Sequence, residues 1–346
     1  MGTQTKATSI RSTAIGHQAE ASGADSISIG TLSGASNTHS IAIGDKARAY
    51  GIDAIAFGAS ANATATNAMA VGRNARSTAG GSVAVGINTE VTQINSVAMG
   101  ATAKAYGDSA VSLGVDVVSR GHSAVAVGAN ADALAQSAVS IGDSTLANAH
   151  NAVSVGISSQ ATAERAIAMG DSTRATAWDG VAIGTAAKAN ATGAVAIGKD
   201  ALANQEAGTA VGIGAEATGQ YAAAFGDVAK ASVRWGTAIG TGSLANVAAG
   251  AVGYDPSGAF HSDDTTGTWK STLGAVAVGD TTRNKTRQII GVAAGTNDTD
   301  AVNVAQLKAA QLGGGGDSSW VIQDTNSPQG RKTIDKNNPL TVRGDR

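Results

Sequence analysis

The stretch SVAVGINTEVTQINSVAMG, residues 82–100, holds two copies of one pattern: a small residue, two bulky apolar residues around an alanine, and a glycine. Its glycines, Gly86 and Gly100, are fourteen residues apart. The same interval recurs without a gap at Gly16, Gly30, Gly44, Gly58, Gly72, Gly86, Gly100, Gly114, Gly128, Gly142, Gly156, Gly170, Gly184 and Gly198. A short period kept this strictly is typical of proteins in which each repeat packs only on its neighbours. The sequence therefore predicts a rod whose function lies on its surface and at its ends.

Aligned on the glycine, the repeats show two bulky apolar columns, one and three positions before it, as in Ile43 and Ile41. These columns share one face of a strand, because alternate residues of a strand point the same way. The positions between and before them hold small residues, such as Ala42 and Ser40. A face kept this small indicates that another backbone approaches it closely. The pattern leaves open which face fills the repeat and which meets neighbouring chains.

A shorter alternation follows each glycine, with alanine three and five positions on and a frequently charged residue between, as in Ala47, Arg48 and Ala49. Turn formers such as Asp53 and Asn67 stand five positions before each glycine. Two strands and two turns in fourteen residues predict a flattened parallel β-roll, an all-β solenoid with glycine at the bend. Nineteen coils, counting Gly214, Gly226, Gly240, Gly253 and Gly279, would stack to roughly 90 Å at ~4.8 Å per strand.

The roll's core is thin for a structure of this length. Each coil offers two bulky apolar residues against two alanines, and aromatic residues make up 3% of the chain. A repeat array normally needs caps or partners to cover such surfaces. We therefore expect self-association along the whole rod.

The spacing predicts several segments along the chain. A head occupies 1–253, although Gly214 and Gly226 follow Gly198 at sixteen and then twelve residues. The segment 254–273, YDPSGAFHSDDTTGTWKSTL, is an insert, expected to be a loop or hairpin that either binds a partner or covers the last coils. A last coil at 274–286 precedes a neck and the start of a stalk at 287–312, in which a helix begins near Asp300, capped by Asp298 or Asp300. A glycine-rich break and an incomplete further module, with Trp320, occupy 313–346.

Composition argues against several function classes. Lys and Arg total 24 against 26 Asp and Glu, so no basic excess points to nucleic acid. The chain has no cysteine, and its five histidines occupy different columns or distant coils, so we predict no metal site, no cofactor and no catalytic residues. Aspartates after the glycine, such as Asp45, are better explained as turn residues than as calcium ligands. No column is uniformly threonine, as an ice-binding surface requires, and no carboxylates cluster as in polysaccharide-cleaving helices.

The SVAVG or SIAIG repeat, followed by GVAAGTNDTDAVNVAQLK at 291–308, resembles the head and neck of trimeric autotransporter adhesins with YadA-like heads. The resemblance covers about Thr13 to Lys308. It implies a homotrimer of left-handed parallel β-rolls on a bacterial surface. It also implies a clasp between head and stalk, formed by the neck residues Asp300, Ala301, Val302, Asn303, Val304, Gln306 and Leu307.

The same resemblance implies a function. Such heads attach bacteria to host cells or matrix proteins of the collagen, fibronectin or laminin class, and contribute to virulence. The signal peptide and the outer-membrane anchor of the family are expected outside this chain. The alternative is a structural spacer that presents a more distal binding domain.

Two features of the sequence are candidate contact sites. Six basic residues four positions past a glycine form an interrupted stripe: Arg48, Arg76, Lys104, Arg174, Lys188 and Lys230. The stripe either attracts acidic matrix glycans or proteins, or is a solvated face, since Glu20 and Asp132 stand in the same column. Residues Arg343, Gly344 and Asp345 spell the integrin-type tripeptide, a string that also arises by chance.

Overall fold

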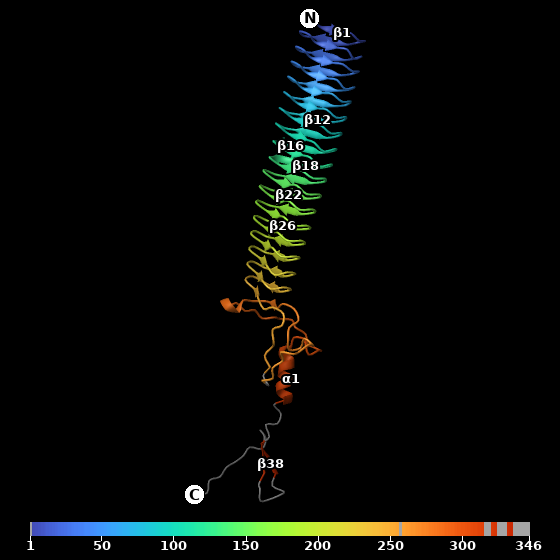
Figure 1. Ribbon diagram of the computed structural model, residues 1–346. Coiled ribbons are helices and arrows are strands. Elements are labelled where there is room, and N and C mark those ends of the chain that lie inside the picture. Colours follow the sequence, from blue (N-terminus) through green and yellow to red (C-terminus); the bar gives the residue numbers. More distant parts are fainter. Residues whose placement is uncertain (1, 256–257, 315–319, 324–330, 335–346) are drawn as a thin grey trace. The chain divides into compact units, whose positions relative to one another are not determined.

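The computed structural model describes residues 2–255, 258–314, 320–323 and 331–334. The chain forms two units, residues 1–251 with 271–286, and residues 252–270 with 287–346. The first unit is a stack of short parallel strands, one coil above the next (Figure 1). The integrin-type tripeptide at 343–345 lies outside the described residues.

One wall of the roll, here called the short-strand sheet, is built from two-residue strands. Each pairs in parallel with its equivalents fourteen residues away, for example Lys104 opposite Val118. Its strands are β1 (Lys6–Ala7), β3 (Glu20–Ala21), β5 (Gly34–Ala35), β7 (Arg48–Ala49), β9 (Asn62–Ala63), β11 (Arg76–Ser77), β13 (Glu90–Val91), β15 (Lys104–Ala105), β17 (Val118–Ser119), β19 (Asp132–Ala133), β21 (Leu146–Ala147), β23 (Gln160–Ala161), β25 (Arg174–Ala175), β27 (Lys188–Ala189), β29 (Leu202–Ala203), β31 (Glu216–Ala217), β33 (Lys230–Ala231) and β35 (Leu244–Ala245).

The opposite wall, here called the long-strand sheet, contains the bulky apolar columns. Its strands also pair in a fourteen-residue register, Val83 with Val97 and Ala84 with Ala98. They are β2 (Thr13–Ile15), β4 (Ile27–Ile29), β6 (Ile41–Ile43), β8 (Ile55–Phe57), β10 (Met69–Val71), β12 (Val83–Val85), β14 (Val97–Met99), β16 (Val111–Val115), β18 (Val125–Ala129), β20 (Val139–Ile141), β22 (Val153–Val155), β24 (Ile167–Met169), β26 (Val181–Ile183), β28 (Val195–Ile197), β30 (Thr209–Val211), β32 (Ala223–Phe225), β34 (Thr237–Ile239) and β36 (Val276–Ala277).

Small residues fill the space between the two walls. Ala42 in the long-strand sheet and Ala49 in the short-strand sheet are both fully buried, whereas Phe57 is 52% exposed. The question left open by the pattern is thereby answered: the small face is the interior and the bulky face points outward. Two walls this close leave room mainly for small side chains, and the largest that are fully buried are valine and threonine, such as Val91 and Thr145. The close backbone approach inferred for the small columns is thus made by the opposite wall of the same chain.

Several of the serines inside the roll occur in hydrogen-bonded pairs. Ser112 and Ser119 are joined by a hydrogen bond of 2.6 Å, and Ser154 and Ser159 by another of 2.6 Å. Because a buried hydroxyl without a partner is costly, each serine of these pairs is matched by a hydroxyl on the other wall, whereas Ser26, Ser40 and Ser96 donate to backbone carbonyls. In the paired coils, the choice between Ala and Ser in one small column is therefore coupled to the residue on the opposite wall.

Both corners of each coil require unusual backbone conformations. The fourteen glycines of the predicted series have φ between 122 and 140°, and a Cβ on Gly114 would lie 1.7 Å from the carbonyl oxygen of Gly128. The turn formers five positions earlier are left-handed, with φ of 56° at Asp53. A second left-handed column, two positions past each glycine, was not predicted and includes Leu32. There the ladder of backbone hydrogen bonds between coils holds the conformation, as with Lys46 N to Thr31 O at 2.8 Å.

Two expected coil markers were wrong. The ladder continues without displacement through Gly212, with φ of 134°, and Gly226, while Gly214 occupies the left-handed corner two residues later. Gly253 lies beside the isolated bridge between Val252 and Lys270, and not at a coil bend. Strand β34 pairs directly with β36, so the residues between β35 and β36 leave the coil path. The roll closes with the 3₁₀ helix η1 (Thr281–Arg283), which Asp280 caps.

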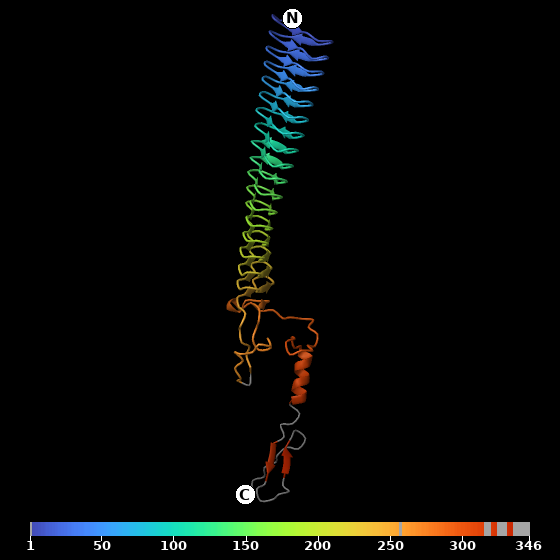
Figure 2. The same cartoon turned by 45° about the vertical axis from the view of Figure 1, so that its right-hand side comes forward.

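The second unit contains most of the insert, up to residue 270, and the neck. Helix α1 (Val304–Gly314) follows an irregular segment, and β37 (Trp320–Gln323) pairs antiparallel with β38 (Arg331–Ile334) (Figure 2). The predicted cap at Asp298 or Asp300 is wrong. Asn303 is the cap: its Oδ1 accepts from Gln306 N at 3.0 Å, and Gln306 Oε1 accepts from Asn303 N at 3.2 Å. This reciprocal pair is a capping box. No helix in the described part of the chain is long and apolar enough to cross a bilayer.

Candidate functional site

The outward face of the long-strand sheet is a continuous apolar surface. It consists of the two bulky columns, one and three positions before each glycine. Met99 is 45% exposed and Ile239 46%, and the three-position column is partly buried by its own neighbours. Because these two positions are apolar in most coils, with Thr13, Thr209 and Thr237 as polar exceptions in the three-position column, the surface is an apolar strip along the roll. An apolar strip of this size marks an interaction surface.

The six predicted basic residues occupy the short-strand sheet, each at the first position of its strand. They do not form an unpaired stripe. Arg76 lies 3.5 Å from Glu90, and Lys230 donates to Glu216 at 2.8 Å. Of the six, Arg174 and Lys188 stand in adjacent strands, while Arg48, Lys104 and the others are separated by neutral or acidic neighbours. The column is one of mixed charge, which favours the solvated face over an anion-binding stripe.

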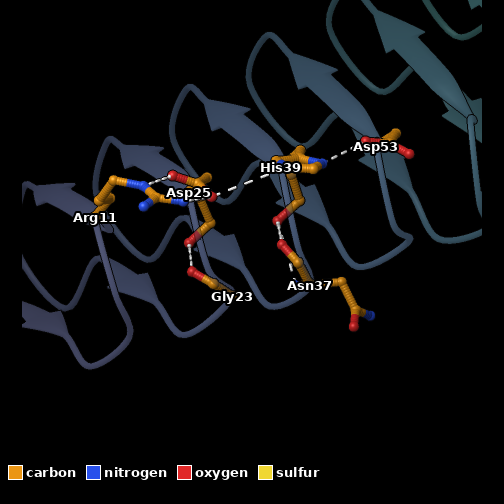
Figure 3. A network of polar contacts seen from close by, with 8 residues as sticks. Arg11, Gly23, Asp25, Asn37, His39 and Asp53 are labelled. Atoms are coloured by element: carbon orange, nitrogen blue, oxygen red, sulfur yellow. Dashed lines mark hydrogen bonds and ion pairs between the residues drawn. The ribbon is translucent and has the colours of Figure 1, made fainter.

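A polar ladder runs along the first coils at the left-handed corner (Figure 3). The Arg11 guanidinium donates to both carboxylate oxygens of Asp25, one of them at 2.7 Å, and His39 lies between Asp25 at 3.8 Å and Asp53 at 2.9 Å. The hydrogen bond from Arg11 holds the pKa of the Asp25 carboxyl below its ordinary value. All four residues stand five positions before successive glycines. By residue type the aspartates are predicted as turn formers and the histidines as residues of distant coils, whereas the fourteen-residue spacing groups these four residues in one column.

Aromatic and basic residues share the same corner in later coils. The Arg165 guanidinium lies 4.9 Å from the Trp178 ring centre and also pairs with Asp179 at 2.6 Å. Arg234 lies 3.9 Å from the Trp235 ring centre. These contacts were not predicted, because the column mixes residue types. They form an exposed ridge of cation–π pairs.

Within the insert, Asp264 organises the chain. Its carboxylate accepts from the backbone N–H of Trp269 at 2.6 Å and from both the N–H and the hydroxyl of Thr266 at 2.8 and 2.6 Å. These hydrogen bonds, that of the Thr266 hydroxyl first, lower the pKa of Asp264 to about 2. His261 stacks on Trp269 with ring centres 4.5 Å apart. The insert is therefore a folded loop with its own polar centre.

In the neck, two polar side chains hold the irregular segment before α1. Gln306 binds the backbone of Gly295 twice, accepting from its N–H at 3.1 Å and donating to its carbonyl at 2.9 Å. Asp300 accepts from the N–H groups of Thr296 and Asn297, each at 2.9 Å, which lowers the pKa of its carboxyl. Among the remaining predicted neck residues, Ala301, Val302, Val304 and Leu307, the three larger side chains are more than half exposed. The polar side chains of the neck hold its backbone through hydrogen bonds, and its larger apolar side chains are exposed.

No group of three or more His, Cys, Asp or Glu residues gathers closely enough to hold a metal ion within the described ranges.

Comparison with known proteins identifies the repeats. The family model described as YadA head domain repeat (2 copies) matches residues 1–33, 35–61, 63–89, 92–116, 119–145, 147–173 and 175–201. The model described as coiled stalk of trimeric autotransporter adhesin matches residues 288–313. This chain belongs to the trimeric autotransporter adhesin family. The resemblance inferred from the repeat and the neck is confirmed, and so is the all-β parallel β-roll.

Two curated adhesins share part of the sequence. Autotransporter adhesin BadA of Bartonella henselae is 64% identical over 67 residues, and trimeric autotransporter adhesin AtaA of Acinetobacter sp. (strain Tol 5) is 54% identical over 68 residues. Each match covers 19% of this chain and 2% of the relative, so the chain spans a small part of either adhesin's length. The expectation of a non-enzymatic protein agrees with a family of adhesins.

Among solved structures, the collagen-binding domain of the Yersinia adhesin YadA is similar. The sequence identity is 27% and the TM-score 0.34, with 60% of this chain and 85% of that chain covered. In this adhesin family member, the surfaces available for binding are the long-strand sheet, the short-strand sheet and the two corners.

Proposed function

We propose that this chain is the head segment of a bacterial surface adhesin. Three copies pack through the apolar faces of their long-strand sheets, and the short-strand sheets face outward and attach the cell to host-cell or matrix molecules. Attachment of this kind contributes to virulence. The head is displayed on the surface of the outer membrane, as the family suggests.

The observation that supports self-association is the location of the bulky residues. The interior of the roll is filled by alanine and serine, so the residues that contribute most to hydrophobic stabilisation are the ones left partly exposed. Fully burying a Val or Ile side chain contributes about 1.5–3 kcal/mol. With two partly exposed bulky residues in each coil, association would add at most roughly that amount per coil and per chain. The exposed part of these side chains becomes stabilising when another chain covers it.

The form of the surface supports attachment through many weak contacts. The short-strand sheet presents a shallow, mixed-charge face repeated along the rod, and a trimer presents it three times. Weak single contacts gain overall strength when several are made at once. Collagen, fibronectin and laminin, the classes that the family resemblance implies, are the first ligands to test.

The assembly is tested by light scattering of the chain on a size-exclusion column. A trimer has a mass of three times 33.7 kDa, about 101 kDa. The double variant Val125→Asp/Val127→Asp places two charges on the apolar face and is expected to give 33.7 kDa. The control is Val118→Asp, on the opposite sheet, which is expected to stay trimeric. A monomeric wild-type chain would refute the assembly.

Attachment is tested with the trimer on immobilised collagen, fibronectin and laminin, and on host cells. Binding by the wild-type trimer that is lost in the monomeric double variant supports a multivalent adhesin. A stable trimer that binds none of these surfaces, while a longer chain with more distal residues does, would favour the spacer.

A further inference from the structure

The short-strand sheet has one notch that its other coils lack. The first position of each strand carries a side chain in every coil except at β5, where Gly34 stands. Glycine is not required there by the backbone, because its φ is outside the left-handed region, and Val118 occupies the same position in another coil. What glycine provides is empty space on the outer wall.

The side chain of Tyr50, from the next coil, lies beside this space. A Cβ on Gly34 would lie 3.1 Å from Tyr50 Cε1 and 3.3 Å from its hydroxyl oxygen, with no backbone atom among the nearest contacts. The tyrosine does not fill the notch, since a cavity of about 190 Å³ remains, lined by Glu20, Ser22, Gly34, Ala35, Ser36 and Tyr50. Tyr50 stays 41% exposed. An aromatic ring therefore forms one wall of an open cavity on the sheet.

Another coil has an equivalent tyrosine beside a strand whose first position carries a side chain. Tyr106 stands sixteen residues after Glu90, as Tyr50 stands sixteen after Gly34, and its hydroxyl donates to Glu90 Oε2 at 2.6 Å. Within the described residues, the Tyr50 hydroxyl, the Glu20 carboxylate and the hydroxyls of Ser22 and Ser36 have no hydrogen-bond partner in the protein. The notch therefore gathers four hydrogen-bonding groups that are not used by the fold.

We propose that this notch is a binding site for a neutral sugar residue of a host glycan. A carboxylate and hydroxyls pair with sugar hydroxyls, and an aromatic ring carries the apolar C–H face of a pyranose. The lining contains one carboxylate and no cation, so an uncharged sugar fits better than an acidic one. The inference deepens the proposed adhesin function and rests on it.

The surroundings suit a chain of sugars. A wider depression of about 580 Å³ adjoins the notch on the other side of Glu20, lined by Gln4, Thr5, Lys6, Gln18, Glu20 and Leu32. Glu20 borders both cavities, so a second sugar residue extends along the sheet past its carboxylate. Because the notch is on the short-strand sheet, packing of the opposite apolar faces leaves it open, and a trimer presents three copies.

The test uses the purified full chain on an array of neutral, sialylated and sulfated mammalian oligosaccharides, followed by titration of the best neutral oligosaccharide. Gly34→Val fills the notch with a residue that the column accepts, and Glu20→Gln removes the charge. Each is expected to weaken binding about tenfold or more, since a hydrogen bond to a charged group is involved. Asp132→Asn, at the same column position in another coil, is expected to bind within about twofold of wild type. Circular dichroism of each variant checks the fold.

Binding confined to acidic oligosaccharides, binding that Gly34→Val leaves unchanged, or an array without any signal would each overturn the sugar site. If the wild-type trimer still attaches to matrix proteins or cells in those cases, the adhesin function stands and only the notch inference fails. If the trimer attaches to nothing and the array is blank, both are refuted.

Discussion

The bend glycines allow a quantitative prediction, for which Gly128→Ala is the best placed substitution. Gly128 has φ of 134°, and a Cβ there would lie 2.0 Å from the Gly142 carbonyl oxygen and 2.7 Å from its carbon. These are backbone atoms, so they cannot rotate away. A conformation open essentially to glycine costs about 1–3 kcal/mol, and overpacking costs a further 1–3 kcal/mol. The expected loss is therefore about 2–6 kcal/mol, concentrated in one coil.

The assay is amide hydrogen exchange followed by mass spectrometry, because a solenoid opens locally and a global midpoint would hide the defect. Peptides covering 125–145 include the Gly142 N–H, which donates to Val127 O at 2.8 Å in the wild type. Exchange through local opening there should rise by at least about 30-fold, since 1.4 kcal/mol corresponds to a factor of ten. Peptides several coils away should be unchanged.

The matched control is Gly80→Ala. Gly80 has a φ outside the left-handed region, and a Cβ there would lie 3.7 Å from its nearest neighbour, Thr66 O. Alanine should be neutral or stabilise by about 0.4–1 kcal/mol through the unfolded state. If Gly128→Ala exchanged like the wild type and like Gly80→Ala, the close approach of successive coils would not be the reason for the glycine ladder.

Two further predictions concern the second unit. In the neck, Asn303→Ala removes the cap of α1 and should cost about 1 kcal/mol, seen as roughly fivefold faster exchange in peptides from 304–312. Thr299→Ala, outside the cap, is the control. Equal exchange rates in the two variants would show that Asn303 does not cap α1. In the insert, the pKa of Asp264 is lowered from 3.8 to about 2, so its contribution to stability is complete above pH 3.8 and is lost as the pH falls toward 2. The Trp269 amide signal in NMR should therefore keep its neutral-pH position at pH 4.5 and shift between pH 3.8 and 2. Asp264→Asn should make the insert sensitive to protease at pH 7, whereas Asp263→Asn should not, and a protease-resistant Asp264→Asn variant would contradict the role of the carboxylate.

The predictions from sequence that were wrong concern positions where several residues of a suitable type are available. The residue that takes the position is decided by contacts with other side chains or other coils, which an alignment of the repeats does not show. Asp298, Asp300 and Asn303 are all acceptable caps by residue type, and the choice is made by Gln306, which pairs with Asn303 while Asp300 is occupied by Thr296 and Asn297. Residue type alone predicts a bend at Gly214, whereas Gly212 occupies the bend position and has the φ of the other bend glycines. The notch at Gly34 can be recognised only when the location of the Tyr50 side chain is known, and Tyr50 belongs to another coil.

By itself, the sequence determined the period, the two strands and two turns of each coil, the glycine bend and the family. These features depend on contacts between residues fourteen apart or fewer, and a strict repeat records such contacts in every copy. Only the tertiary structure decided which face is inside. Hydrophobicity alone favours burying Ile41 and Ile43, but the distance between the two walls admits only Ala42 and Ala49, and the bulky residues are left on the surface. That single packing constraint places the bulky apolar residues on one outer face of the roll and the mixed-charge column on the other.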